Sequence, residues 1–270
     1  MAKKGRPRRD HYSRGEMLGK YRIVSLLGEG GFAKVYKAFD VVEARDVALK
    51  VPHEHLLQDG MDELLREVRI TVTLDHPHIL PIRNATFVGN RLVIAYPLGE
   101  RSLAARLKHR IASRTVLDIA DQLLDAVAYA HARRVIHCDI NPDNVILFDG
   151  HEARLTDFGI ARFAFRTRMS GSGSGTIGYM APEQALGQPS FRSDVFSLGM
   201  VTYRMFTGQL PKWPFDWPPP GIQRLRRKVK PELVAFLKRA MHVNEKKRFK
   251  SAIRMQTVFE QILRRGALRE

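Results

Sequence analysis

The sequence has only one cysteine, Cys138, among its 270 residues. A single cysteine excludes an internal disulfide framework and suits a reducing compartment, so we expect a cytoplasmic protein. No apolar run reaches the roughly 20 residues that a membrane-spanning helix needs, and no secretory signal pattern or internal repeat is present. These absences predict a soluble chain without a membrane segment. Whether it is one part of a larger receptor stays open.

Composition and charge set wide bounds on the function. The hydrophobic share of 44% is ordinary for a globular protein, and 270 residues can bury the core of a two-lobed enzyme. The formal net charge of +17 would suit an acidic partner such as nucleic acid, a membrane surface or an acidic protein. No aromatic residues are interleaved with the basic clusters, so stacking on bases is not indicated. We interpret the charge mainly as a solvated basic face, with an acidic partner for the basic tail as the alternative.

Local patterns place the expected elements along the chain. Residues 1–16 are basic and poor in apolar groups, which predicts a disordered tail. The Ser-Gly repeat at 170–175 should be mobile, and the proline-rich stretch 213–221 should be a loop. Apolar spacing predicts helices, and Ser113 is the expected N-cap of the second of them: Met61–Leu74, Ser113–Arg133, Val195–Phe206, Pro231–Met241 and Ala252–Leu263.

Two acidic side chains and one amide stand where phosphoryl transfer needs them. They lie in the segments His137-Cys138-Asp139-Ile140-Asn141-Pro142-Asp143-Asn144 and Asp157-Phe158-Gly159. Asp139 can accept the proton of an attacking hydroxyl, while Asn144 and Asp157 can hold Mg²⁺, or Mn²⁺, against the phosphates of ATP. We expect His137 to be a packed structural residue and not a base.

A glycine-rich segment lies between two expected strands near the N-terminus. It reads Gly28-Glu29-Gly30-Gly31-Phe32-Ala33-Lys34-Val35. Glycines in such a turn let backbone N–H groups approach phosphates. The segment therefore indicates a phosphate-binding loop.

Lys50 lies in an apolar run that begins Val47-Ala48-Leu49-Lys50, where an unpaired lysine would be costly. Glu67 lies beside the apolar stripe of the expected helix Met61–Leu74, with Arg66 and Arg69 around it. An ion pair between Lys50 and Glu67 would explain the lysine and would orient it towards the α- and β-phosphates of ATP.

In this order, the motifs resemble those of the Ser/Thr protein kinases, of the compact Hanks type found in bacteria. The end of their activation segment resembles the segment Gly175-Thr176-Ile177-Gly178-Tyr179-Met180-Ala181-Pro182-Glu183. The start of their central helix resembles the segment Ser193-Asp194-Val195-Phe196-Ser197-Leu198-Gly199. The resemblance runs from Gly28 to Arg248 and so covers nearly the whole chain.

The resemblance implies an α+β, bilobal protein kinase-like fold. We expect a small β-rich N-lobe at 17–96, a larger helical C-lobe at 97–265 and a C-terminal tail at 266–270. It also implies structural roles: Glu183 would form a buried ion pair with Arg248, and Asp194 would cap its helix and brace the catalytic loop. The strand Arg91-Leu92-Val93-Ile94-Ala95-Tyr96-Pro97-Leu98 resembles the one that holds adenine.

The resemblance assigns the site residues. ATP would bind between the lobes, and proteins with Ser or Thr would be the substrates. Ile94 would guard the adenine pocket, the carbonyl of Ala95 would accept from the adenine amino group, and Pro97 stands where a backbone N–H is usual, which proline lacks. The catalytic residues would be Asp139, Lys50, Glu67, Asn141 and Thr176, with Asn144 and Asp157 on the metal; the ATP-binding residues would be Gly28, Glu29, Gly30, Gly31, Phe32, Val35, Ala48, Lys50, Ile94, Ala95 and Pro97.

Three positions depart from the family pattern. Ala33 replaces the third glycine, which is a mild change. Cys138 replaces the arginine that receives an activating phosphate, so we hypothesise that a phosphothreonine in residues 167–176 does not switch the protein on. Asn141 replaces the lysine that contacts the γ-phosphate, and losing that charge can cost orders of magnitude in rate. Arg162 is one residue that could compensate.

These departures leave three alternatives beside an ATP-dependent Ser/Thr protein kinase with a non-RD catalytic loop. A pseudokinase scaffold would not need the full set of Lys50, Glu67, Asp139, Asn144 and Asp157. A small-molecule phosphotransferase of the aminoglycoside or choline kinase type would fit Cys138 and Asn141 better. It would leave the glycine loop and the activation-segment motif unexplained. A basic nucleic-acid-binding module would leave every motif unexplained.

Overall fold

The computed structural model describes residues 11–54, 60–158 and 177–269. By its internal contacts the chain forms two compact units, residues 1–68 with 81–98, and residues 69–80 with 99–270. The expected lobe boundary at 96/97 lies near the division at 98/99. Residues 69–80, placed by sequence in the N-lobe, pack with the larger unit instead. Among the described residues, no helix combines the length and hydropathy needed to cross a membrane.

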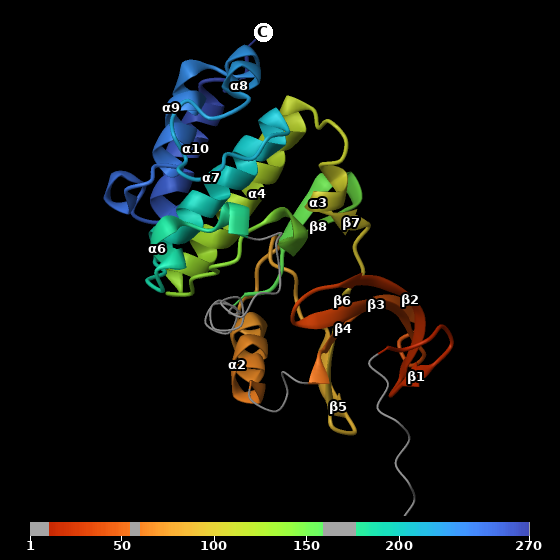
Figure 1. The fold of residues 1–270 in the computed structure, drawn as a ribbon. Helices are drawn as coiled ribbons and strands as arrows, with labels where there is room; N and C mark the ends of the chain where they lie inside the picture. The colour runs from red at the N-terminus through yellow and green to blue at the C-terminus, as the bar shows by residue number, and fades with distance from the viewer. Residues whose placement is uncertain (1–10, 55–59, 159–176, 270) are drawn as a thin grey trace, which may run out of the picture. The chain divides into compact units, whose positions relative to one another are not determined.

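The smaller unit is built on a six-stranded antiparallel sheet (Figure 1). Its strands lie in the order β1-β2-β3-β4-β6-β5, and side chains on one face form its apolar core, for example Tyr36, Ala38 and Leu49. Helix α2 (Met61–Val72) begins in this unit. The strand bounds are β1 Met17–Leu18, β2 Tyr21–Glu29, β3 Ala33–Asp40, β4 Arg45–Pro52, β5 Asn84–Val88 and β6 Arg91–Pro97.

The larger unit is mainly helical. Helix α4 packs against both α7 and α10 around the main apolar core (Figure 1). A small sheet in the order β7-β8-β9 carries the segment around Asn144. The helices are α3 Leu103–Arg106, α4 Ser113–Ala132, α6 Pro182–Ala185, α7 Phe191–Thr207, α8 Ile222–Lys228, α9 Pro231–Ala240 and α10 Ala252–Arg264; the strands are β7 Arg101–Ser102, β8 Val145–Phe148 and β9 Glu152–Leu155; the short 3-10 turns are η1 Pro142–Asn144, η2 Asp149–His151, η3 Ile177–Tyr179 and η4 Glu245–Lys247.

One expected helix cap and one expected helix start are wrong. Helix α4 has Ala112 at its N-cap, with extended backbone and no side-chain cap, so Ser113 is already the first helical residue. Helix α7 starts at Phe191, four residues before the expected Val195, because Ser190 and Ser193 form a reciprocal capping box there. Asp194 therefore lies within the first turn of α7 and is not its cap.

The buried carboxylate of Asp194 braces the catalytic loop instead of capping its own helix. It accepts hydrogen bonds from the backbone N–H groups of His137 and Cys138, both at 2.8 Å. It also accepts from Nε2 of His131 on α4 at 2.9 Å. The expected bracing role is confirmed, and its physical basis is a buried anion satisfied by three N–H donors.

Glu183 at the start of α6 pairs with Arg248, as expected. The guanidinium donates to both carboxylate oxygens, at 2.7 and 3.0 Å, and Ser193 donates a third bond at 2.7 Å. Arg248 is 2% exposed. Burial alone would raise the pKa of Glu183, but the bonds from Arg248 and Ser193 hold that pKa below its ordinary value.

Replacing Arg248 with methionine should lower the free energy of unfolding by about 3–5 kcal/mol, because it leaves a half-buried carboxylate without its cation. Urea unfolding measures this change. Arg254→Met, at an exposed position of α10, is the matched control and should change stability little. An equal loss of unfolding free energy in the two variants would show that the Arg248–Glu183 pair does not stabilise the fold as expected.

The pair should also give the protein an acid-sensitive contribution to its stability. The pKa of Glu183 is lower in the folded protein than in the unfolded chain. The ionised carboxylate therefore contributes its full stabilisation at a pH above the ordinary pKa of a glutamate, and this stabilisation is lost as the pH falls through the pKa of the folded protein. The stability difference between the native chain and the Glu183→Gln variant should therefore shrink on acidification from neutral pH. A difference that stays constant would contradict this.

Candidate active site

In the smaller unit, Lys50 and Glu67 form a buried ion pair. The Nζ and Oε1 atoms lie 3.5 Å apart, and the two residues are 6% and 5% exposed. Lys50 lies in β4 opposite Val35 of β3 and Ile94 of β6, and Glu67 comes from α2. The pairing expected from the sequence is present, and it explains how a lysine can lie within an apolar strand.

The predicted phosphate loop joins β2 to β3. The N–H of Gly30 donates to the carbonyl of Ala33 at 2.9 Å, and Nε2 of His53 lies 2.8 Å from the carbonyl of Gly30. Neither Gly28 nor Gly30 has a positive φ, and a Cβ added at either position would meet nothing closer than 3.9 Å. The fold itself therefore does not require these glycines, whereas a group approaching the backbone would.

The expected adenine-binding strand, β6, is fully integrated in the sheet. Ile94 and Ala95 are 2% and 1% exposed. The carbonyl of Ala95, expected to accept from adenine, already accepts the N–H of Arg83 at 2.9 Å. A carbonyl has two lone pairs, so adenine would share this acceptor. Pro97 ends the strand and has no N–H to donate. The structure thus adds one restriction to the missing N–H of Pro97: the carbonyl of Ala95 is already shared with Arg83.

In the larger unit, Asp139 is held between two amides. The Nδ2 group of Asn141 donates to Oδ1 and to the backbone carbonyl of Asp139, both at 3.0 Å. The Nδ2 group of Asn144 donates to Oδ2 at 3.0 Å and to the same carbonyl at 2.9 Å. Each amide thus uses both of its hydrogens on Asp139, and each carboxylate oxygen receives one of them. The arrangement fixes the direction in which the carboxylate points.

The other end of the Asn141 amide forms the N-cap of η1. Its Oδ1 accepts from the N–H groups of Asp143 and Asn144, at 2.9 and 3.3 Å. Asn141 is 3% exposed. Since both hydrogens of its amide are used on Asp139, it has no donor left over for a phosphate group.

His137 is a structural residue, as expected. It is fully buried, and its ring lies 4.6 Å from that of Phe158. Its Nδ1 accepts the N–H of Asp139 at 3.2 Å, so Nε2 carries the proton and donates to the carbonyl of Thr156 at 2.9 Å. Both ring nitrogens are thereby used to link the two segments around Asp139 and Asp157.

The two expected metal ligands come together at one end of the β8–β9 hairpin. Asn144 precedes β8, Asp157 follows β9, and Thr156 donates its N–H to the carbonyl of Asn144 at 2.9 Å. Asp157 has a φ of 65°, a conformation that non-glycine residues seldom adopt. One carboxylate and one amide oxygen suit Mg²⁺, which keeps several waters and binds phosphates as well. The described residues contain no cluster of three or more His, Cys, Asp or Glu that would form a closed metal site.

Cys138 precedes Asp139 and is 6% exposed. Burial, and then the neighbouring carboxylates of Asp194 and Asp139, raise the pKa of its thiol. The thiol is therefore neutral and a poor nucleophile at neutral pH. The backbone of Cys138 has a φ of 62°.

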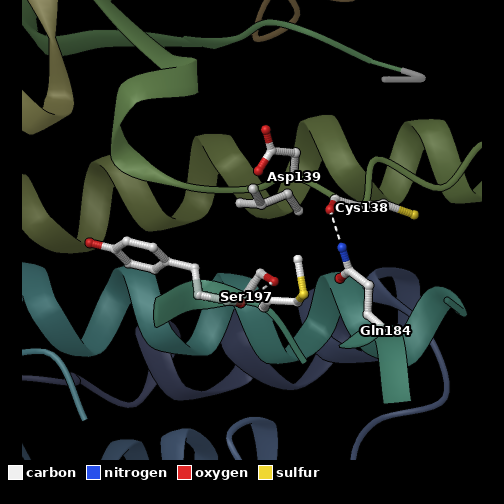
Figure 2. Close-up of a pocket in the computed structure, with 7 residues that line it drawn as sticks. Cys138, Asp139, Gln184 and Ser197 are labelled. Atoms are coloured by element: carbon white, nitrogen blue, oxygen red, sulfur yellow. Dashed lines mark hydrogen bonds between the residues drawn. The ribbon is translucent and has the colours of Figure 1, made fainter. Parts of the chain in front are cut away.

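A small recess next to Asp139 and Cys138 is also lined by residues to which the sequence analysis gave no role in the site (Figure 2). The most notable is Gln184, whose Nε2 donates to the carbonyl of Cys138 at 2.5 Å. In the sequence, Gln184 is only a polar residue that follows Glu183, so its role in this recess could not be predicted. The expected site residue Thr176 and the compensating Arg162 lie outside the described residues, as do Gly159 and the Ser-Gly repeat at 170–175. The recess is lined by Cys138, Asp139, Ile140, Tyr179, Met180, Gln184 and Ser197.

A strand-borne lysine paired with a helix glutamate, followed by a buried aspartate, an asparagine five residues later and a second aspartate, is the order of parts found in phosphotransferases of the protein kinase type. The chain matches the protein kinase domain over residues 21–261, and so it belongs to the protein kinase family.

Curated relatives agree with this membership. The chain is 32% identical over 204 residues to the serine/threonine-protein kinase PrkC of Bacillus subtilis, a match covering 72% of this chain and 31% of PrkC. It is 35% identical over 207 residues to the DNA damage-responsive serine/threonine-protein kinase RqkA of Deinococcus radiodurans, covering 72% and 31%. It is 36% identical over 215 residues to pkn2 of Myxococcus xanthus, covering 75% and 26%. The match thus spans about a third or less of these relatives.

Solved structures show the same fold. The crystal structure of the Mycobacterium tuberculosis PknI kinase domain superposes with a TM-score of 0.72 at 24% identity, covering 93% of this chain and 99% of that one. The chain therefore has the protein kinase fold that the sequence predicted.

Proposed function

We propose that this chain is an ATP-dependent serine/threonine protein kinase. The observation that carries the proposal is Asp139: a buried carboxylate fixed by Asn141 and Asn144, at the end of the hairpin that also presents Asp157. The Lys50–Glu67 pair and the open glycine loop support it from the smaller unit. The names of the curated relatives support serine and threonine as the acceptors.

We assign a role to each of the main site residues that the structure describes. Lys50, oriented by Glu67, holds the α- and β-phosphates of ATP, and the backbone of Gly28–Phe32 approaches them as well. Asp139 orients the substrate hydroxyl and accepts its proton during in-line transfer of the γ-phosphoryl group. Asn144 and Asp157 would hold Mg²⁺. When bound, this ion neutralises charge on the phosphates.

The Asn141 position makes this active site electrostatically unusual. Its amide is neutral and uses both hydrogens on Asp139, so this residue offers the γ-phosphate neither a charge nor a free donor. We infer that transfer depends more on the positioning of Asp139 and less on cationic stabilisation than in relatives with a lysine there. The expected cost is a slow chemical step, not loss of activity.

The first test is mass spectrometry of the purified chain after incubation with Mg·ATP and a generic basic protein substrate. New phosphate on serine or threonine is expected, and it should disappear in the Asp157→Asn and Asp139→Asn variants. Absence of phosphate from both proteins, with ATP binding still visible as a thermal shift, would overturn the proposal. That outcome would favour a pseudokinase scaffold or a small-molecule phosphotransferase.

Asn141→Asp separates the bonds that the Asn141 side chain donates from those that it accepts. A carboxylate can still cap η1, but it cannot donate to Asp139 and adds a like charge beside it. We expect kcat to fall by about 100-fold or more, with KM for ATP changed far less and the melting temperature lowered, because a buried carboxylate would face the acceptors of Asp139. Steady-state kinetics and a thermal melt measure the three quantities.

Asn244→Asp is the matched control for this substitution. Asn244 caps η4 through the same kind of bond, accepting the N–H of Lys246 at 2.9 Å. This variant should keep kcat. Similar kcat values in Asn141→Asp and Asn244→Asp would show that the amide of Asn141 has no role in positioning Asp139.

Activation should not require phosphate on the segment 167–176. Cys138 offers a buried neutral thiol where the family pattern has a phosphate-binding arginine. The combined replacement of Thr167, Ser170, Ser172 and Ser174 by alanine should leave kcat within about threefold of the native value, since no receiver for the phosphate stands at position 138. Loss of activity in this variant, measured on the same substrate, would refute the hypothesis.

A further inference from the structure

The peptide group that joins Cys138 to Asp139 is held from both sides. Its carbonyl accepts a hydrogen bond from Nε2 of Gln184 at 2.5 Å. Its N–H donates to Nδ1 of His137 at 3.2 Å. A peptide group is planar, so fixing both polar atoms fixes the orientation of the plane. The carbonyl of Asp139 is held by Asn141 and Asn144 as well, so the backbone is restrained on both sides of the Asp139 side chain.

This constraint acts on a strained segment. Cys138 has a φ of 62°, and backbone strain of this kind persists only where the surrounding structure over-determines it. The N–H of Cys138 is held by Asp194 of α7 at 2.8 Å, and its carbonyl by Gln184 of α6. Both polar backbone groups of the residue before Asp139 are therefore bound to side chains from other elements.

Gln184 is itself firmly placed. It follows Glu183, which Arg248 and Ser193 hold with three hydrogen bonds. Gln184 is 6% exposed. Figure 2 shows its side chain directed at the carbonyl of Cys138, while the carboxylate of Asp139 points away from it. Gln184 therefore reaches the catalytic loop through the backbone and does not touch the carboxylate.

We propose that Gln184 is a positioning residue for Asp139, a role that rests on the proposed kinase activity. It transmits the anchored position of α6 to the peptide before the proton acceptor. The site needs this bond because Asn141 supplies no charge to the phosphate. Phosphoryl transfer therefore depends mainly on the placement of Asp139.

The alternative is that Gln184 only satisfies a buried carbonyl. Its second polar atom, Oε1, is buried and has no hydrogen-bond partner among the described residues. Gln184→Met keeps the length of the side chain, removes the donor and also removes this unpartnered oxygen. The variant should therefore fold, since one lost bond is partly offset by the loss of a buried unpaired acceptor.

Cys138 provides a built-in reporter that does not depend on activity. It is the single cysteine of the chain, it is buried, and its carbonyl is the group that Gln184 binds. The rate at which a disulfide reagent such as DTNB labels its thiol in the native protein measures how often this loop opens.

The experiment compares the native chain with Gln184→Met, and with Gln188→Met as matched control. Gln188 is exposed and lies four residues further along. In Gln184→Met we expect kcat to fall by about 10- to 100-fold, as expected when a reacting group is misplaced. KM for Mg·ATP should stay within about twofold, because Lys50 is untouched. Thiol labelling should be about tenfold faster, the effect of one lost bond on a local opening. Gln188→Met should match the native chain.

Unchanged kcat and unchanged labelling in Gln184→Met would overturn the proposal. A fall in kcat that merely follows the unfolded fraction in a thermal melt would do the same. Gln184→Glu, which keeps the shape but lacks the N–H donor at neutral pH, should reproduce the loss. If neither variant folds while Gln188→Met does, the role is purely structural and the proposal fails.

Failure of the proposed function would be visible separately. In that case the native chain itself would transfer no phosphate. The labelling comparison would still show whether Gln184 holds the Cys138–Asp139 peptide: faster labelling in Gln184→Met supports the hold, and equal labelling refutes it.

Discussion

The buried carboxylate of Asp194 is the interaction on which the larger unit depends. It is fully inaccessible to solvent and accepts hydrogen bonds from His131, His137 and Cys138. The Nδ1 atom of His131 in turn accepts the N–H of Ala252 at the start of α10 at 3.0 Å. One anion thus joins α4, α7, α10 and the catalytic loop. A buried charge of this kind is tolerated only while all its donors stay in place, so the position of the loop is tied to the packing of the helices.

A second buried charge extends the same logic to α6. Arg248 holds Glu183, and the residue after Glu183 is the one that binds the loop carbonyl. The loop before Asp139 is therefore connected to the helical core by two routes, through Asp194 to its N–H groups and through Gln184 to its carbonyl. Removing either anchor would leave a buried polar group unpaired. The geometry of the loop before Asp139 is therefore a consequence of how the helical unit satisfies its internal charges.

The sequence could predict features that follow from residue type and spacing. A lysine in an apolar strand needs an acidic partner, which pointed to Glu67, and amphipathic periodicity placed α4, α9 and α10 to within a residue or two at each end. It could not predict contacts set by tertiary hydrogen-bond direction. Ser113 has the chemistry of a cap, yet the backbone of Ala112 occupies that position. The sequence also gives no indication that the amide of Gln184 donates to the carbonyl of Cys138.

The departures from the family pattern acquire a common meaning in the structure. An arginine at position 138 and a lysine at position 141 would both add positive charge around Asp139, whereas this chain has a neutral buried thiol and an amide there. An amide cannot stabilise a phosphate as a cation does, but its two ends can hold geometry, and Asn141 caps η1 with one end and binds Asp139 with the other. The residues around Asp139 thus contribute fixed geometry in place of positive charge. Such a site should tolerate changes in surface charge well and respond sharply to any loss of a single hydrogen bond behind Asp139.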